Sequence, residues 1–424
     1  MLDSKTIRAR TAALRATMAA KRVDADLDRW LALDERRREL LGEIEQLRHQ
    51  QKAASDGIAA TKKSGGDASA VLERMKEIST RLKILEKDLA DVEPEQEEIA
   101  RWFPNIVHES VPHGGPEANH VLRHWGEPPV KDFEVRAHDD IAEALGLLDL
   151  TRAAKISGSG FVLWKGTGAK LRRALIRFML DMHVNEHGYT EVSPPYLISR
   201  ESLFGTGQLP KLEDDMYHID KDDMFLNPTA EVPLTNMFRD ETFDEDELPL
   251  KITGYCPSFR REAGSHGRDT RGIVRVHQFD KVEIVKISTA EAGYAEHESL
   301  LQDAEDILQR LGVPYRVVFI ADGDMGFSGA KQWDLELFAA GEGGRWLEVS
   351  SCSIFEEFQA RRIGIRYRPA AGGGKARLAY TMNASGVALP RLMVALLENG
   401  QNADGTITLP AALVPYMDGL TEIA

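Results

Sequence analysis

Residues 258–283 read SFRREAGSHGRDTRGIVRVHQFDKVE and decide how the chain is interpreted. The runs at 254–259 and 273–279 mix apolar with polar side chains, as strands with one wet face do. A glycine-punctuated loop separates the two runs, so we expect their ends to meet as a hairpin. Arg260 can then face a phosphate, Phe279 can stack on a base, and Glu262 and Glu283 can accept from amino groups. This predicts a site for a charged nucleotide, although a solvated edge with ordinary ion pairs fits the charge content equally well.

The bulk properties bound the class of protein. A chain of 424 residues with 42% hydrophobic content is expected to form two or three domains. It contains no apolar run long enough to cross a membrane and no apolar signal core at the amino end, so we expect a cytoplasmic protein. The two cysteines, Cys256 and Cys352, exclude a disulfide framework and have no zinc-ligand spacing around them.

Charge is unevenly distributed along the chain. The formal net charge is −15, yet residues 1–90 hold 19 Lys and Arg against 15 Asp and Glu, a local net charge of +4. An acidic body with a locally basic amino-terminal part is compatible with binding nucleic acid through that part.

The amino-terminal part carries a heptad pattern. Apolar residues recur at steps of four and three through Val71, Met75, Ile78, Leu82, Leu85 and Leu89. An upstream run fits the same frame, with Arg37 and Gln51 as polar interruptions: Trp30, Leu33, Leu40, Ile44, Leu47, Ala54 and Ile58. The glycine-containing turn at residues 62–67 predicts an antiparallel two-helix hairpin, an arm about 45 Å long at ~1.5 Å per residue. A dimerising coiled coil and two helices of a compact bundle fit the pattern as well.

The rest of the chain indicates an α+β body. A helix is expected at residues 169–187, together with short strands at 189–192, 224–226, 317–320, 333–338, 346–349 and 365–367. The absence of a regular βαβ rhythm favours an antiparallel sheet flanked by helices. We expect three parts: residues 1–110 with the arm at about 28–93, a linker rich in Pro and Gly at 111–135, and the body at 136–424.

Three further segments have a possible chemical use. Thr229 and Glu231 could hold an ammonium group, although residues 227–231 also suit a helix N-cap. Glu348 and Ser351 offer oxygen ligands for Mg²⁺, although an ordinary strand edge is the commoner explanation. Small residues at 380–386 lead into a helix expected at 387–397 that carries Arg391, an arrangement that suits an anion and also occurs in plain packing.

Taken together and in this order, these features resemble the bacterial-type seryl-tRNA synthetases, a family of class II aminoacyl-tRNA synthetases. The resemblance covers essentially the whole chain. It rests on the helical hairpin, on class II signatures that begin with residues 188–195, and on the strings FGTGQLP at 204–210, PTAEVPL at 228–234, DMGF at 324–327 and EVSSCS at 348–353.

The resemblance implies an ATP-dependent serine–tRNA ligase that works through seryl-adenylate, with Arg260 and Arg391 as catalytic residues. The implied serine site consists of Thr229, Ala230, Glu231, Arg260, Glu283, Asn383 and Ser385. The implied ATP site consists of Arg260, Arg261, Glu262, Val276, Phe279, Glu348, Val349, Ser350, Ser351 and Arg391. Glu348 and Ser351 would also hold Mg²⁺.

The resemblance also implies partners. The body at 136–424 becomes the catalytic domain of a homodimer, and residues 1–110 become a tRNA-binding domain whose coiled-coil arm meets the long variable arm of serine tRNA. Whether selenocysteine tRNA is also serylated stays open. The cations expected to face tRNA are Arg36, Arg37, Arg38, Arg48, Lys52, Lys62 and Lys63.

Three positions depart from the family pattern. Ala384 and Pro390 stand where glycine is usual, and Arg261 replaces a small residue. A methyl group at Ala384 could tighten the serine site, alter its preference or simply be accommodated, whereas proline in a first helical turn is well tolerated. The rival functions are a paralogue that loads a carrier protein, or one that tolerates a serine-mimicking inhibitor, and an inactive scaffold protein. The intact arm argues against the carrier-protein paralogue, and the retained charged residues Arg260, Glu262, Glu283, Glu348 and Arg391 argue against the scaffold protein.

Overall fold

A computed structural model describes residues 1–63, 67, 69–263, 271–370 and 374–424, with only the backbone for residues 58–63. The chain divides into two compact units, Met1–Pro104 and Asn105–Ala424. In the described part of the chain, no helix combines the length and the apolar character that crossing a membrane requires.

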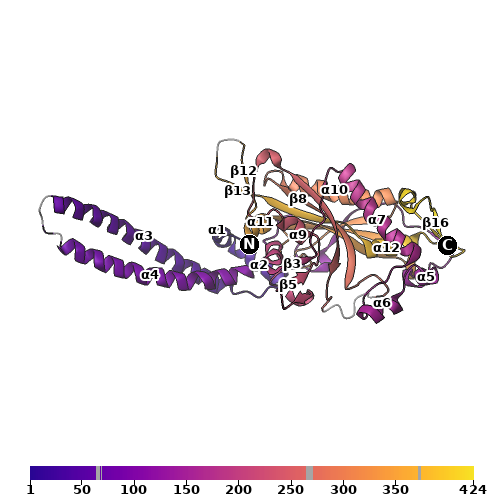
Figure 1. The fold of residues 1–424 in the computed structure, drawn as a ribbon, viewed down its shortest axis with the longest axis horizontal. Coiled ribbons are helices and arrows are strands. Elements are labelled where there is room, and N and C mark those ends of the chain that lie inside the picture. The colour runs from indigo at the N-terminus through magenta and orange to yellow at the C-terminus, as the bar shows by residue number, and fades with distance from the viewer. Residues whose placement is uncertain (64–66, 68, 264–270, 371–373) are drawn as a thin grey trace. The chain divides into compact units, whose positions relative to one another are not determined.

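The first unit contains the predicted hairpin. After the short helices α1 (Ser4–Ala9) and α2 (Thr11–Ala20), the long helices α3 (Leu27–Lys63) and α4 (Ser69–Arg101) run antiparallel, side by side (Figure 1). The heptad residues between them are buried in one cluster formed by Leu40, Ile44, Ile78, Leu82 and Leu85. The helical hairpin within one chain is therefore confirmed. Residues 64–66 of the expected turn and the side chain of Ile58 lie outside what the structure describes.

The two polar interruptions of the heptad pattern are both bonded across the hairpin. The Nε2 atom of Gln51 donates to Oγ of Ser79 at 3.3 Å, and the Arg37 guanidinium pairs with Glu93 at 3.0 Å. A polar residue in this frame thus lowers the stability of the hairpin only slightly, because it forms a hydrogen bond or ion pair with the facing helix.

The second unit is built on an eight-stranded sheet, in the order β1-β9-β10-β11-β14-β8-β7-β2. Its strands are β1 (His120–Trp125), β9 (Tyr315–Phe319), β10 (Lys331–Ala339), β11 (Arg345–Glu356), β14 (Tyr380–Ala388), β8 (Gln278–Ser288), β7 (Leu250–Phe259) and β2 (Thr190–Glu191). All neighbours are antiparallel except β2 and β7. The α+β prediction is confirmed, with one short parallel strand at an edge.

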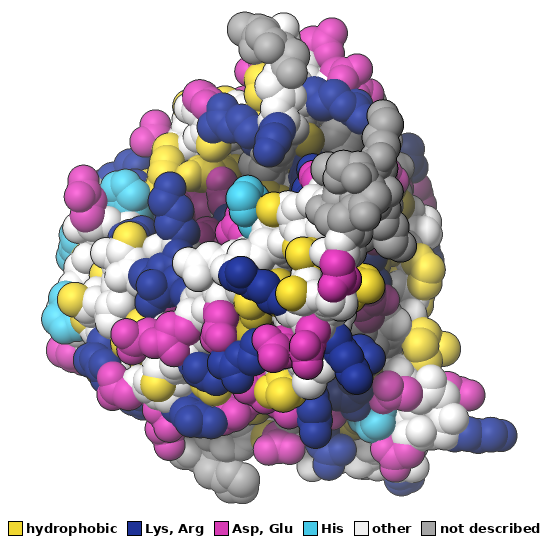
Figure 2. Space-filling model, turned by 90° about the vertical axis from the view of Figure 1, so that its left-hand side faces the viewer, with side chains coloured by type: hydrophobic (Ala, Val, Ile, Leu, Met, Phe, Trp, Pro, Cys, Tyr) yellow, Lys and Arg dark blue, Asp and Glu magenta, His cyan; other side chains and the backbone are white. Residues whose placement is uncertain are grey.

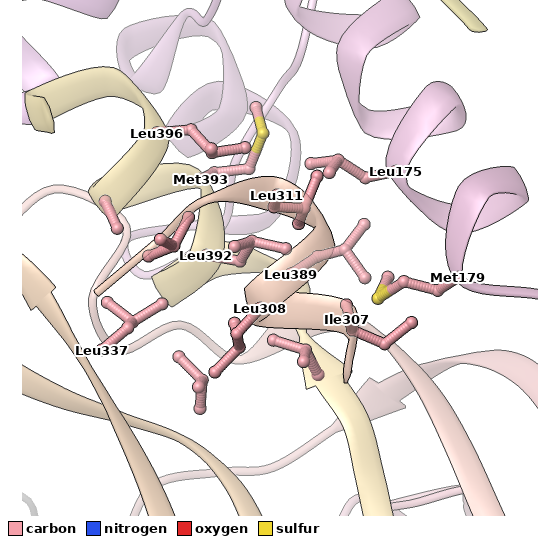
Figure 3. Packing of buried hydrophobic residues seen from close by; sticks show 14 of the residues in the cluster. Leu175, Met179, Ile307, Leu308, Leu311, Leu337, Leu389, Leu392, Met393 and Leu396 are labelled. Carbon is pink, nitrogen blue, oxygen red and sulfur yellow. The ribbon is translucent and has the colours of Figure 1, made fainter. Parts of the chain in front are cut away.

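Three helices pack on one face of this sheet: α7 (Gly166–Asn185), α10 (Gly293–Leu311) and α12 (Leu389–Asn399). Their apolar stripes meet strand side chains in the main core. Figure 3 shows Leu308 of α10 close to Leu337 of β10, with Leu175 and Met179 of α7 on the other side of the same cluster. The opposite face carries polar side chains on its central strands, while Ile252, Cys256 and Val285 of β7 and β8 form a further apolar cluster there.

Smaller elements surround the sheet. The helices are α5 (His138–Ala144), α6 (Leu150–Ser157), α8 (Arg200–Thr206), α9 (Glu231–Asn236) and α11 (Glu357–Ile363), with 3-10 turns η1 (Pro116–Ala118), η2 (Glu213–Asp215), η3 (Glu245–Glu247), η4 (Gly341–Gly343) and η5 (Ala411–Met417). The minor strands are β3 (Leu197–Ser199), β4 (His218–Ile219), β5 (Met224–Leu226), β6 (Thr242–Asp244), β12 (Arg366–Arg368), β13 (Arg377–Leu378), β15 (Ile407–Thr408) and β16 (Glu422–Ile423).

Several element boundaries differ from the sequence-based expectation. The hairpin of β7 and β8 forms, with Phe259 opposite Gln278, but residues 273–277 precede the strand. The carboxyl-terminal helix begins at Leu389 rather than 387, because β14 continues to Ala388. The stretch 111–135, expected as a linker, contains β1, which pairs with β9 at the edge of the main sheet. Ladder hydrogen bonds to a distant strand order this segment, and no local pattern announces them.

Candidate active site

A cavity of about 390 Å³ opens on the polar face of the sheet. Strand alternation explains its lining, because successive side chains of a strand point to opposite faces. The cavity face receives Phe279, Lys281 and Glu283 from β8, Ser351 and Ser353 from β11, and Asn383 and Ser385 from β14. The intervening residues lie in the helix-covered core: Val282, Ile284, Cys352, Ile354, Met382 and Ala384. The pleat of three central strands thus builds the floor of the cavity.

Glu231 is a buried carboxylate at the start of α9, held by neutral donors. Gln359 donates to its Oε1 atom at 2.8 Å, and Gln208 donates to its Oε2 atom at 3.3 Å. Burial, and next the negative charge of Glu283, raise the pKa of Glu231 to about 7. The N-cap residue of α9 is Ala230, which makes no side-chain capping bond, but Thr229 Oγ1 accepts from the Glu231 N–H at 3.3 Å, so Thr229 also supports the start of the helix.

Glu283 is a second buried carboxylate, and it has a cationic partner. Lys281 Nζ lies 2.5 Å from Glu283 Oε2 and donates to Thr229 Oγ1 at 2.7 Å, while Asn383 Nδ2 donates to Glu283 Oε1 at 3.0 Å. Burial raises the pKa of Glu283, and the charge of Lys281 opposes that rise. The cavity therefore offers one carboxylate bound by amides and one bound by an ammonium group.

Arg260 and Phe279 form the nucleotide side of the cavity. The Arg260 guanidinium carbon lies 5.3 Å from the centre of the Phe279 ring, and its Nε atom donates to the Pro228 carbonyl at 3.4 Å. Glu262 forms an ion pair with Arg275, and both line the cavity. A planar base could enter against Phe279 with a guanidinium beside it, an arrangement that suits stacking with a nearby phosphate.

Arg391 reaches the cavity from α12. The register of β14 against β8 shifts between Ser385 and Ala388, and the chain then enters the helix with Pro390 in the first turn. Arg391 Nη1 donates to the Glu348 carbonyl at 2.7 Å and lies 3.5 Å from the carboxylate of the same residue.

Three predicted residues do not line the cavity. Ala230 is buried in an apolar cluster, Ser350 donates to the Ser385 carbonyl at 2.6 Å, and the Arg261 guanidinium lies over the Tyr217 ring at 5.7 Å. The other predicted side chains all line it: Thr229, Glu231, Arg260, Glu262, Val276, Phe279, Glu283, Glu348, Val349, Ser351, Asn383, Ser385 and Arg391.

Sequence reasoning missed four polar residues at or behind the cavity wall. Lys281, Gln208, Gln359 and Asp334 each bond a predicted site residue. Two of these carried a local signal, because Lys281 alternates with Phe279 and Glu283 in the strand and Gln208 stands in the string at 204–210. The others come from distant parts of the chain.

Two family models match the chain. The model described as tRNA synthetase class II core domain (G, H, P, S and T) matches residues 212–400, and the seryl-tRNA synthetase N-terminal domain matches residues 1–107. The serine–tRNA ligase of Caldanaerobacter subterraneus subsp. tengcongensis is 50% identical over 418 residues, which cover 98% of each chain. The chain belongs to the seryl-tRNA synthetase family. Its activity is the ATP-dependent attachment of serine to tRNA.

Other members of the family agree over the full length. The serine–tRNA ligase of Desulforapulum autotrophicum is 47% identical, covering 100% of this chain and 99% of its own. Among solved seryl-tRNA synthetases, the Pyrococcus horikoshii enzyme complexed with ATP is 36% identical, with a TM-score of 0.92 over 100% of this chain and 99% of its own. The cytoplasmic Naegleria fowleri ligase in complex with AMP is 26% identical, with a TM-score of 0.86 over 97% and 95%.

The two departures from the synthetase family pattern near the serine site are both accommodated. The Ala384 methyl group lies in the core on the helix-covered face, so it does not narrow the cavity, contrary to the sequence-based concern. Pro390 occupies the first turn of α12, where its missing N–H leaves no helical bond unmade.

Proposed function

We propose that this seryl-tRNA synthetase forms seryl-adenylate in the cavity of β8, β11 and β14, with the serine ammonium at Glu231 and the serine hydroxyl at Glu283 and Ser385. The observation that carries the proposal is the convergence of two buried carboxylates with Arg260 in one cavity. An amino acid brings one cation and one anion. Glu231 and Arg260 are the matching pair.

Adenylate formation needs no covalent bond to the enzyme. A carboxylate oxygen of serine attacks the α-phosphorus of ATP, the bond from that phosphorus to the bridging oxygen breaks, and pyrophosphate leaves with the electron pair. Arg260 faces the serine carboxylate and the α-phosphate, and Arg391 faces the departing phosphates. Positioning and charge stabilisation by these two guanidinium groups supply the catalysis.

The donor set also fits Mg²⁺ as a group shared with the substrate. Glu348 and Ser351 line the cavity, and Ser351 donates its hydroxyl hydrogen to Asp334 at 2.9 Å, which leaves its oxygen lone pairs available. In the described part of the chain no group of three or more His, Cys, Asp and Glu side chains could hold a metal ion, and Mg²⁺ usually takes several of its ligands from substrate phosphates and water. When bound, Mg²⁺ would neutralise phosphate charge as the leaving group departs.

Selectivity for serine rests on a different free-energy penalty for binding alanine than for binding threonine. Alanine lacks the hydroxyl and would leave the polar groups around Glu283 without a partner, which can discriminate by roughly 10⁴. Threonine adds a methyl group and must be rejected by size, a weaker filter.

We assign recognition of tRNA to the arm and propose that the enzyme acts as a homodimer in the cytoplasm. The arm's arginines are largely engaged with carboxylates of the facing helix, as in Arg36–Asp88 at 3.5 Å and Arg48–Glu86 at 2.8 Å. Exposed lysines that form no ion pair within the described part are better placed for RNA phosphates: Lys52, Lys76, Lys83 and Lys87. Figure 2 shows both charge signs interspersed over one face of the molecule, so no single basic patch on that face locates the tRNA.

Serine-dependent exchange between ATP and pyrophosphate, followed by transfer to tRNA, tests the proposal. We expect exchange with serine and charging of serine tRNA. Replacing residues 28–93 by a short linker should abolish charging and spare exchange, because the cavity belongs wholly to the second unit. Loss of both activities would contradict the assignment of tRNA recognition to the arm and of adenylate formation to the second unit. Exchange without charging in the full chain would point to another acceptor, such as a carrier protein.

A further inference from the structure

The serine part of the cavity holds one charged side chain to which no role has been assigned, namely Lys281. Its side chain is 8% exposed and that of Glu283 is 1% exposed. A lysine this deeply buried gives up hydration of its ammonium group and therefore needs close partners. It has two, the Glu283 carboxylate at 2.5 Å and the Thr229 hydroxyl at 2.7 Å.

The two cavity carboxylates differ in what holds them. Glu231 receives hydrogen bonds from the amides of Gln208 and Gln359, which carry no charge. Glu283 accepts a hydrogen bond from the side-chain amide of Asn383 and forms an ion pair with the ammonium group of Lys281. Among the described residues that bond these two carboxylates, Glu283 has a cationic partner and Glu231 has none.

A second cation entering the cavity will therefore be drawn to Glu231. We propose that Lys281 is a positioning residue that decides which of the two carboxylates receives the serine ammonium, and so keeps Glu283 free to accept from the serine hydroxyl. The inference rests on the proposed function of the cavity. With serine bound, Glu231 pairs with the ammonium, Arg260 with the carboxylate and Lys281 with Glu283, so that each buried charge has a partner.

Removing the charge of Lys281 makes the two carboxylates equivalent. Glu283 then either competes for the serine ammonium or takes up a proton, and in both cases it becomes a poorer acceptor for the hydroxyl. Alanine shares the ammonium and the carboxylate with serine and lacks only the hydroxyl. The loss should therefore appear in the ratio of kcat/KM for serine over alanine, and not in the use of ATP.

The test measures pyrophosphate exchange with serine and with alanine in the wild-type enzyme, in Lys281→Gln and in Lys281→Met. Glutamine can still donate to Glu283 or Thr229 without charge, so it separates charge from hydrogen bonding. We expect the serine-to-alanine ratio to fall by roughly 10- to 100-fold in both variants, the size expected for losing one charged partner. The KM for ATP should stay within about threefold.

Lys286 provides a matched control on the same strand. It is fully buried and lies near two carboxylates, Glu296 at 3.2 Å and Asp303 at 3.3 Å, but it faces α10 and does not line the cavity. Lys286→Met should lower the melting temperature and leave the serine-to-alanine ratio unchanged.

Three outcomes would overturn the inference. An unchanged ratio in Lys281→Gln would show that charge is not the determinant. An equal fall in Lys286→Met, or a loss of ATP use that parallels the loss of serine use, would reduce Lys281 to a structural residue. A wild-type enzyme without serine-dependent exchange would instead remove the proposed function itself, and the two failures are therefore distinguishable.

Discussion

Ion pairs of the arm and of the serine cavity use the same kinds of residue in opposite surroundings. In the arm, Arg48 and Glu86 lie 2.8 Å apart with side chains 65% and 45% exposed. In the cavity, Lys281 and Glu283 lie 2.5 Å apart with side chains 8% and 1% exposed. Water and salt screen the first pair and scarcely reach the second.

The two regions therefore depend on different interactions: apolar packing sets the register of the arm, and in the proposed function charge pairing sets the substrate specificity of the cavity. The arm's register depends on buried leucines, and its exposed charges are individually replaceable, whereas Asp34 at the base of α3 is buried and paired with Arg8 and Arg38. At the cavity, the apolar residues lie on the helix-covered face of the sheet. Glu231, Glu283 and Lys281 each have a defined hydrogen-bond or ion-pair partner. Exposure of a charged group, rather than its distance from a partner, predicts the cost of losing it.

The largest expected effect comes from the cavity. Arg260→Ala should reduce serine-dependent pyrophosphate exchange by about 10³-fold, because it removes the guanidinium that faces developing charge. Arg261→Ala is the matched control, since its neighbouring side chain lies over Tyr217 and outside the cavity. Equal losses in both variants would mean that the change acts through the fold.

Next comes the apolar seam of the arm. Leu85→Ala should lower the opening free energy of α3 and α4 by about 2–4 kcal/mol, because Leu85 is 1% exposed and packs between the helices. Amide hydrogen exchange of the two helices measures this. Leu72→Ala, at a residue 50% exposed, serves as the control and should leave protection nearly unchanged. Similar effects at both positions would refute the packing we describe.

A smaller effect concerns pH. The pKa of Glu231 is about 7, and the serine ammonium binds its ionised form, so the KM for serine should fall about tenfold as pH rises from 6 to 8. Burial is the main cause of this raised pKa and the charge of Glu283 adds to it, whereas Gln359, Lys281 and Arg260 oppose the rise. Steady-state exchange at a series of pH values checks the direction. Glu231→Gln should bind serine weakly and without this slope, and a slope that survives in that variant would assign the titration to another group.

The smallest effect belongs to the exposed arm pairs. A double-mutant cycle on Arg48 and Glu86 should give a coupling free energy below about 1 kcal/mol, since both side chains are largely in water. The same hydrogen-exchange measurement reports it, and the coupling should shrink further in high salt. A coupling of several kcal/mol would abolish the contrast between the two regions.

Much of the site could be predicted because its residues fall in short local strings. The alternation of Phe279, Lys281 and Glu283 predicts a shared face, and the structure places all three in the cavity lining. Gln359, in contrast, contacts Glu231 from 128 residues away, and no local pattern marks it. Likewise, Ala384 is expected near the serine site because its neighbours in the sequence belong to that site. The alternation of side chains along β14 instead places its methyl group in the core.

The sequence by itself determined the family, the helical hairpin, the α+β body and most of the charged residues that the cavity collects. Each of these is carried by periodicity or by a contiguous string, in which nearest neighbours along the chain supply the information. Only the tertiary structure decided which face of each central strand meets the cavity, that β1 joins the sheet edge, and that Glu283 is held by an ammonium while Glu231 is held by amides. These depend on strand register and on contacts between distant segments, because charge and burial at a site are properties of what surrounds a side chain in space.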